Sequence, residues 1–184
     1  MSGTIHVLNG STADPGALAA TVERLHSVFH RPVGLHPFHP DLRKVFDPSR
    51  GQYHSSGVLK QMLDDLAAHG SPDDKLISVV DVDLFIPVLT FVYGEAQLNG
   101  RCAVVSTFRL RNELYGLPVN EGLFRARIEK ESVHEAGHLF GLVHCRGFEC
   151  VMRSSTYVEE IDLKPAVLCR ACEERFSIIQ ALPA

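Results

Sequence analysis

The chain has 184 residues, which is enough for one domain or for one domain with a small appendage. Hydrophobic residues make up 45% and charged residues 22%, a composition typical of globular rather than disordered proteins. With 18 Lys plus Arg against 22 Asp plus Glu, the formal net charge is −4, which argues against binding nucleic acid through its phosphates. Five cysteines and ten histidines stand out, because five thiols cannot all pair as disulfides and histidine is a common metal ligand.

The sequence has no apolar run long enough to span a bilayer. Its most apolar stretch, Leu84–Tyr93, contains Pro87 and is too short. The first lysine or arginine is Arg24, so no positively charged segment precedes an apolar one as in a secretory signal. These features predict a soluble, cytoplasmic protein with no membrane partner. In a reducing compartment, clustered cysteines indicate metal binding or catalysis more often than disulfides.

The first half of the chain alternates strand and helix patterns. Apolar residues recur at helical spacing in two segments, and a third run is apolar enough for a strand buried on both faces. The predicted elements are a strand at Thr4–Asn9, a helix at Asp14–His30, a strand at Val33–Leu42, a surface loop at Asp47–Ser56, a helix at Ser55–His69 and a strand at Lys75–Val82.

Two further strands, Val88–Leu98 and Arg101–Leu110, are separated by the dipeptide Asn99-Gly100. This dipeptide favours a type I′ turn and predicts an antiparallel hairpin. A long helix follows at about Glu121–Gly141, and the last forty residues are Cys-rich and irregular. The order of elements predicts an α/β (α+β) fold with a mixed sheet.

The long helix carries two histidines at helical spacing, in the segment His134–His138 with the sequence HEAGH. Residues four apart share one helix face, so both imidazoles can reach one Zn²⁺. Glu135 can project beside the metal and take a proton from a water held there. Gly141 can end the helix with a positive φ, after which His144 can supply a third ligand.

Three histidine ligands leave a fourth position open for water, which is the arrangement of catalytic zinc sites. HExxH alone is a short pattern that also occurs on helices by chance. The glycine and the third histidine favour a zinc site over a buried, purely structural histidine trio.

Four of the five cysteines form two close pairs, Cys145 with Cys150 and Cys169 with Cys172. Such pairs fit a closed tetrahedral zinc site, whose role is structural because no ligand position remains for a substrate. Two disulfides or a redox CxxC motif are the alternatives. Since His144 and Cys145 are neighbours, two zinc ions bound in this way would lie on the order of 10 Å apart.

The segment HEAGHLFGLVH resembles the metzincin pattern HExxHxxGxxH, and its continuation resembles the archaemetzincins in particular. That continuation is Cys145-x4-Cys150-x-Met152, followed by Cys169-x2-Cys172. The resemblance covers His134 to Cys172, about a fifth of the chain, and the motif is matched without departure.

The resemblance implies a role for each motif residue. Glu135 corresponds to the catalytic general base, and Met152 to the methionine of the Met-turn beneath the histidines. The metal ligands it implies are His134, His138 and His144 for a catalytic zinc, and Cys145, Cys150, Cys169 and Cys172 for a structural zinc. The implied cofactors are therefore two Zn²⁺ per chain.

A metzincin-like fold is also implied, with a mostly parallel mixed sheet, an antiparallel edge strand, a backing helix, an active-site helix and a zinc-stabilised irregular C-terminal region. We expect one catalytic domain over residues 1–184, with an upper N-terminal subdomain at 1–141 and a smaller Cys-rich subdomain at 142–184. Metzincins lay an extended peptide along the edge strand, for which Val88–Leu98 is the candidate.

The expected function is that of a zinc-dependent metalloprotease or peptidase (a hydrolase) acting on a peptide or protein, with a monomer favoured. The competing hypothesis is a catalytically silent zinc-binding or peptide-binding protein of the same fold. A third, a nucleic-acid-binding zinc ribbon at the C-terminus, is disfavoured because Glu173 and Glu174 accompany Arg170 and Arg175, which leaves no net basic patch.

Overall fold

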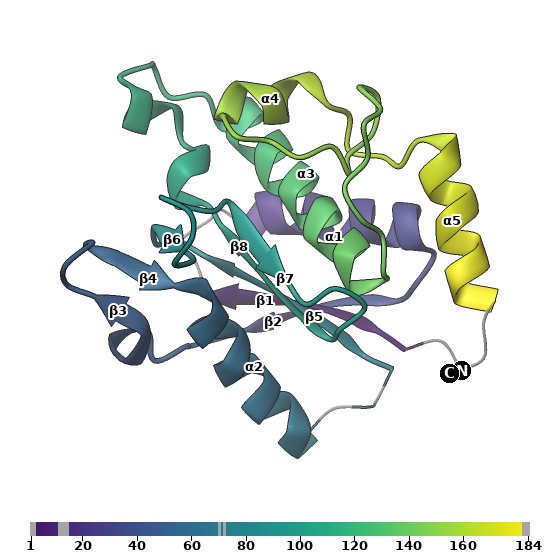
Figure 1. Ribbon diagram of the computed structural model, residues 1–184, viewed down its shortest axis with the longest axis horizontal. Helices are drawn as coiled ribbons and strands as arrows, with labels where there is room; N and C mark the ends of the chain where they lie inside the picture. The colour runs from purple at the N-terminus through teal and green to yellow at the C-terminus, as the bar shows by residue number, and fades with distance from the viewer. Residues whose placement is uncertain (1–2, 11–14, 70, 72, 182–184) are drawn as a thin grey trace.

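A five-stranded mixed sheet forms the centre of the molecule in the computed structural model, which describes residues 3–10, 15–69, 71 and 73–181 (Figure 1). All neighbouring strands are parallel except the last pair, in which the edge strand runs antiparallel. The strand order is β2 (Val33–Pro37), β1 (Ile5–Gly10), β5 (Lys75–Val80), β8 (Cys102–Ser106) and β7 (Gly94–Ala96). The predicted mostly parallel sheet with an antiparallel edge strand is confirmed.

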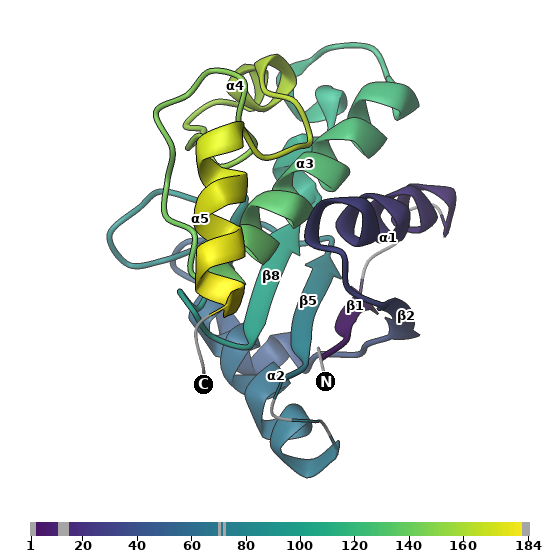
Figure 2. The ribbon, with the colours of Figure 1, turned by 90° about the vertical axis from the view of Figure 1, so that its right-hand side faces the viewer.

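Helices cover both faces of this sheet (Figures 1 and 2). α1 (Pro15–Phe29) and α3 (Glu121–Leu139) lie on one face, and α2 (Ser55–His69) lies on the other. Because side chains alternate along a strand, Ile77 and Val79 belong to the core beneath α1 and α3, whereas Leu76 and Val80 belong to the core beneath α2. Burial on both faces explains the nearly continuous apolar run of β5.

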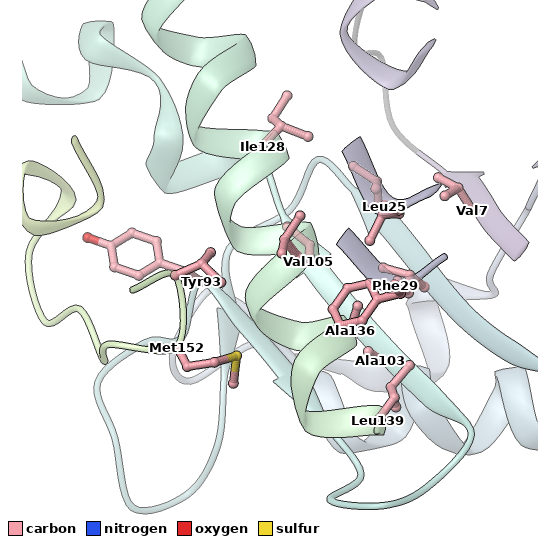
Figure 3. Close-up of a cluster of buried hydrophobic side chains, with 14 of the residues drawn as sticks. Val7, Leu25, Phe29, Tyr93, Ala103, Val105, Ile128, Ala136, Leu139 and Met152 are labelled. Carbon is pink, nitrogen blue, oxygen red and sulfur yellow. The ribbon is translucent and has the colours of Figure 1, made fainter. Parts of the chain in front are cut away.

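The larger core joins α3 to the sheet at the point where the motif residues begin. Figure 3 shows Ala136 and Leu139 of α3 close to Ala103 and Val105 of β8, with Phe29 of α1 beside them. These five side chains are at most 2% exposed. The C-terminal half of α3 is therefore fixed against the sheet.

The hairpin of β7 and β8 exists, but its predicted strands are too long and its predicted turn is wrong. Only Gly94–Ala96 pairs with β8, and residues 97–101 join the two strands. Asn99 has a positive φ of 52° and Gly100 does not, whereas a type I′ turn requires both. The Asn99 amide instead donates to the carbonyl of His138 at 2.8 Å, so a tertiary contact with the end of α3 shapes the loop.

Two other sequence predictions also differ from the structure. The segment 47–56 is not a plain loop: β3 (Phe46–Asp47) and β4 (Gln52–His54) form a small sheet with β6 (Leu84–Phe85). The second strand ends at Pro37 rather than Leu42, since proline lacks the amide that would continue the ladder. Short 3₁₀ helices occupy Leu42–Val45, Phe108–Leu110 and Asn112–Tyr115.

The C-terminal region is more regular than expected, since it contains α4 (Val158–Leu163) and α5 (Arg170–Ala181). Phe176 of α5 packs on Phe29 and Phe140, with ring centroids 5.4 Å apart in both pairs. This aromatic contact attaches α5 to the main core. In the part of the chain that the structure describes, no helix has the length and apolar character needed to cross a membrane.

Candidate active site

The candidate active site is built on the last turns of α3 and on the sharp reversal that follows. The side chain of Asn120 caps the start of the helix by accepting from the Leu123 amide at 3.0 Å. Gly141 has a φ of 83°, as its place after the helix predicts, and the Leu142 amide returns to the Gly137 carbonyl at 2.9 Å. The chain therefore turns back, and His144 lies beside the helix it has just left.

The structure brings the three motif histidines together. His134 and His138 have their Nε2 atoms 3.2 Å apart, and the His144 ring lies with its centroid 5.3 Å from that of His134 and 5.0 Å from that of His138. One nitrogen from each ring lies within 4.8 Å of the other two. His134 is buried, His138 is partly buried and His144 is exposed, so the cluster opens toward solvent at one side.

Hydrogen bonds at the opposite ring nitrogens leave the facing atoms ready to bind a cation. His134 Nδ1 donates to the Val151 carbonyl and His138 Nδ1 donates to the Leu142 carbonyl, both at 2.8 Å. Because a carbonyl only accepts, Nδ1 carries the proton in each neutral ring and the two Nε2 lone pairs face each other. Tetrahedral zinc with ordinary Zn–N bonds would hold its nitrogen ligands about 3.3 Å apart, so the observed spacing fits the metal.

Glu135 lies beside this cluster, 5% exposed, and its carboxylate reaches the edge strand at Gly94. Burial raises the pKa of the Glu135 carboxyl well above the ordinary range of glutamate; the carboxylate of Glu131 adds to the shift, and the ammonium of Lys164 opposes it. Burial also lowers the pKa of His134 well below its ordinary value, which favours the neutral ring that binds metals.

A cleft of about 550 Å³ runs over the histidines and Glu135. The segment 89–96, which includes β7, forms a first wall of the cleft, and the segment 154–156 also contributes to its lining. Arg50 braces the first wall by donating from Nη2 to the carbonyls of Leu89 at 2.9 Å and Thr90 at 3.0 Å. The part of this wall before β7 is thus a braced loop rather than the strand predicted over Val88–Leu98.

Met152 lies beside the C-terminal turns of α3 and is fully buried (Figure 3). Its thioether fills the space next to Gly137, where an added Cβ would lie 3.0 Å from Cε and still closer to the sulfur. The methionine therefore packs against a helix surface that only glycine leaves open.

The four predicted cysteines form a second cluster. Their sulfur atoms all lie within 4.8 Å of one another, with Cys145 and Cys169 3.9 Å apart and Cys150 and Cys172 3.6 Å apart. Four thiolates around tetrahedral zinc would be about 3.8 Å apart, whereas a disulfide needs about 2.05 Å. The Cys169 amide points at Cys150 Sγ at 3.4 Å, a contact that favours a thiolate.

Sequence reasoning missed several residues around the cleft. Ser154, Ser155, Thr156 and Glu131 all line it, and Lys164 forms an ion pair with Glu131. Only Glu131 left a local signal, because it lies four residues before Glu135 on the same helix face. The others reach the site through the tertiary fold.

Comparisons with known proteins agree with this geometry. The sequence model of peptidase family M54 matches residues 44–177. The chain is 40% identical over 128 residues to the archaemetzincin of Methanocaldococcus jannaschii, covering 70% of this chain and 68% of that protein. It is similar in structure to a zinc-dependent peptidase from Methanocorpusculum labreanum, with a TM-score of 0.83, 30% identity and coverage of 94% of this chain and 99% of that one. For the archaemetzincin of Methanopyrus kandleri the TM-score is 0.82 at 28% identity, with 98% and 97% covered.

Proposed function

Because the chain belongs to peptidase family M54, the archaemetzincins, we propose that it hydrolyses peptide bonds as a zinc-dependent peptidase of the metzincin type. One observation carries the proposal: three imidazoles converge in a cleft, and a buried glutamate that lines the same cleft lies beside them. A substrate entering from solvent would meet both together. Metal-assisted hydrolysis is the reaction class that this pairing supports.

In this proposal His134, His138 and His144 hold the catalytic zinc. When bound there, zinc supplies Lewis-acid polarisation of a peptide carbonyl and makes water a better acid. Glu135 acts as the general base: its carboxylate takes a proton from the attacking water and passes it to the leaving amine. The carbonyls of Val151 and Leu142 keep both Nδ1 atoms protonated, which fixes the ring orientation and leaves Nε2 free to bind.

The substrate binds alongside β7, which is the edge of the five-stranded sheet. An edge strand offers unpaired main-chain amides and carbonyls, so an extended peptide can add to it with little dependence on sequence. Apolar side chains at the cleft rim, Leu98 and Val143 among them, would contact the side chains of the peptide. Peptides and proteins are thus the proposed substrates.

The same proposal gives the cysteine cluster a structural role and divides the domain into two parts. Cys145, Cys150, Cys169 and Cys172 hold a structural zinc, which gives two zinc ions per chain. Met152 is the Met-turn residue. The domain consists of an upper part at residues 1–141 and a smaller lower part at 142–184, with the cleft between them.

The proposal is tested by screening a peptide library with zinc-loaded protein. We expect cleavage products that disappear after treatment with a chelator and return when zinc is restored. A Glu135→Gln protein, which retains the shape of the side chain but loses the base, serves as the matched control. Peptide binding without turnover in the zinc-loaded protein would contradict the proposal and favour a catalytically silent peptide-binding protein.

A further inference from the structure

A buried ion pair lies next to the candidate active site, and the proposed mechanism assigns neither of its residues a proton-transfer or metal-binding step. Lys164 Nζ is 3.0 Å from Glu131 Oε1, and the two side chains are 1% and 5% exposed. We propose that this pair is a positioning element that holds the backbone turn 150–153 in place beneath the histidines. The inference rests on the proposed function, because it assigns the pair to the same site.

Lys164 is in contact with both of the segments it would hold together. It is the C-cap residue of α4, and its ammonium extends to Glu131 on α3. The same Nζ donates to the carbonyl of Arg153 at 3.0 Å, directly after Met152. A single cation therefore joins the active-site helix to the backbone of turn 150–153.

Turn 150–153 is also in contact with both candidate metal centres. The Val151 carbonyl accepts from His134 Nδ1 at 2.8 Å, which sets the orientation of that ring. The Met152 carbonyl accepts from the Cys145 amide at 2.9 Å, and Cys145 follows His144. A displacement of the turn would therefore change the orientation of the His134 ring and the position of the backbone between His144 and the cysteine cluster.

Stability alone is a weak reason for such a pair. Two charges lose their hydration on burial, and replacing a buried ion pair with uncharged residues is often neutral or stabilising. Helix α4 is in any case attached to α3 without it. Arg127 donates to both carboxylate oxygens of Asp162 at 2.8 and 2.7 Å, and Lys130 donates to the carbonyls of Ile161 and Asp162, each at 3.0 Å.

The two attachments differ in where they act on α3. Glu131 lies one helical turn before Glu135 and lines the cleft. Arg127 lies eight residues before Glu135, about 12 Å along the helix axis, and does not appear in the cleft lining. Asp162 therefore provides a matched control, since it is also the acidic partner in an ion pair between α3 and α4.

The experiment compares Glu131→Gln with Asp162→Asn, which each turn an ion-paired carboxylate into an amide of the same shape. Zinc retention at the histidine site is measured by competition with a chelator, and thermal unfolding of both holoproteins is recorded. We expect Glu131→Gln to weaken zinc retention at the histidines on the order of tenfold, as for other residues that orient metal ligands. Asp162→Asn should lower the unfolding temperature without this loss.

A second variant covers the case in which Glu131→Gln fails to fold. The double change Glu131→Gln with Lys164→Met leaves no unpaired charge, so it is expected to fold. It should still retain zinc at the histidines less well than the natural chain, and Co²⁺ at that site should show a shifted visible spectrum. Wild-type zinc retention and an unchanged Co²⁺ spectrum in the folded double variant would overturn the inference. Since these readouts do not require turnover, their outcome is separate from that of the peptidase proposal.

Discussion

The carboxylate of Glu135 lies directly against the backbone of Gly94. A Cβ at position 94 would stand 2.6 Å from Glu135 Oε1 and 2.8 Å from Cδ, closer than side chains normally approach. Gly94 begins the edge strand β7 and Glu135 belongs to α3, so this contact joins the edge strand directly to the active-site helix. The φ of Gly94 is not positive, so the backbone conformation does not require a glycine at this position. The glycine is needed because a side chain would collide with the Glu135 carboxylate.

We predict that Gly94→Ala lowers kcat/KM for peptide hydrolysis by about a hundredfold, because the added methyl displaces the carboxylate by a distance that catalysis does not tolerate. Bound zinc should be unchanged, since no histidine is touched. Gly122→Ala is the control: it adds the same methyl group where the nearest atom is 3.6 Å away, and it should leave kcat/KM as it was. Wild-type kcat/KM in Gly94→Ala would show that the carboxylate position is not critical.

A second prediction concerns Met152, which we expect to act through packing. Met152→Leu keeps the volume of the side chain and should cost less than about 1.5 kcal/mol of unfolding free energy with little change in zinc affinity. Met152→Ala should cost about 2–5 kcal/mol, because it leaves a cavity below Gly137. Chemical denaturation and zinc titration measure both quantities. Complete loss of zinc from folded Met152→Leu would mean that the methionine does more than pack.

The sequence predicted best those features that depend on neighbours along the chain. The helix Ser55–His69 was predicted with both ends correct, because its apolar spacing is local. The clustering of His134 and His138 follows from their spacing on one helix, and that of His144 from the positive φ of Gly141.

Features that depend on contacts between residues far apart in the sequence were not predicted, or were predicted wrongly. Asn99-Gly100 does not form a type I′ turn, because the Asn99 amide bonds to His138 across the fold. The strand expected from Val88 begins only at Gly94, since Arg50 and Gln52 bind the preceding carbonyls from another element. Nothing in the local sequence marks Lys164 as the partner of Glu131, 33 residues away.

The two metal centres are predicted to depend on each other. Cys172→Ala removes one sulfur of the cluster. The hydrogen bond from the Cys145 amide to the Met152 carbonyl connects the cluster to the turn beside the histidines, so zinc binding at the histidine site should also weaken. Zinc per chain, measured after dialysis against a weak chelator, should fall at both sites. Cys102→Ala, which alters a buried cysteine outside the cluster, should leave the zinc content unchanged. If one zinc stayed fully bound at the histidines of Cys172→Ala, the two centres would be independent.

The next prediction concerns how the contribution of Glu160 to folding stability depends on pH. The amides of Thr156 and Tyr157 donate to its carboxylate at 2.6 and 3.2 Å and hold its pKa below the ordinary value. A lowered pKa in the folded state means that the carboxylate stabilises the fold above the unfolded-state pKa, and that this contribution is lost as the pH falls through the folded-state pKa.

Glu160→Gln should therefore unfold at lower urea concentration than the natural chain at neutral pH, and the gap should close on acidification to below pH 4 or so. Urea unfolding at a series of pH values measures the difference. Glu159→Gln, a change to the neighbouring exposed glutamate, controls for the loss of one negative charge. A gap of constant size at all pH values would rule out the contribution from ionised Glu160.

The most direct test of the central claim is the rate of peptide hydrolysis by Glu135→Gln, measured in samples whose bound zinc is determined at the same time. The proposed mechanism predicts turnover by the natural chain and a loss of at least about a hundredfold in the variant, since general bases contribute about 10²–10⁴-fold. It also predicts the same zinc content in both, because Glu135 is not among the clustered ligands. Equal rates at equal zinc content would contradict the role of Glu135 as the base.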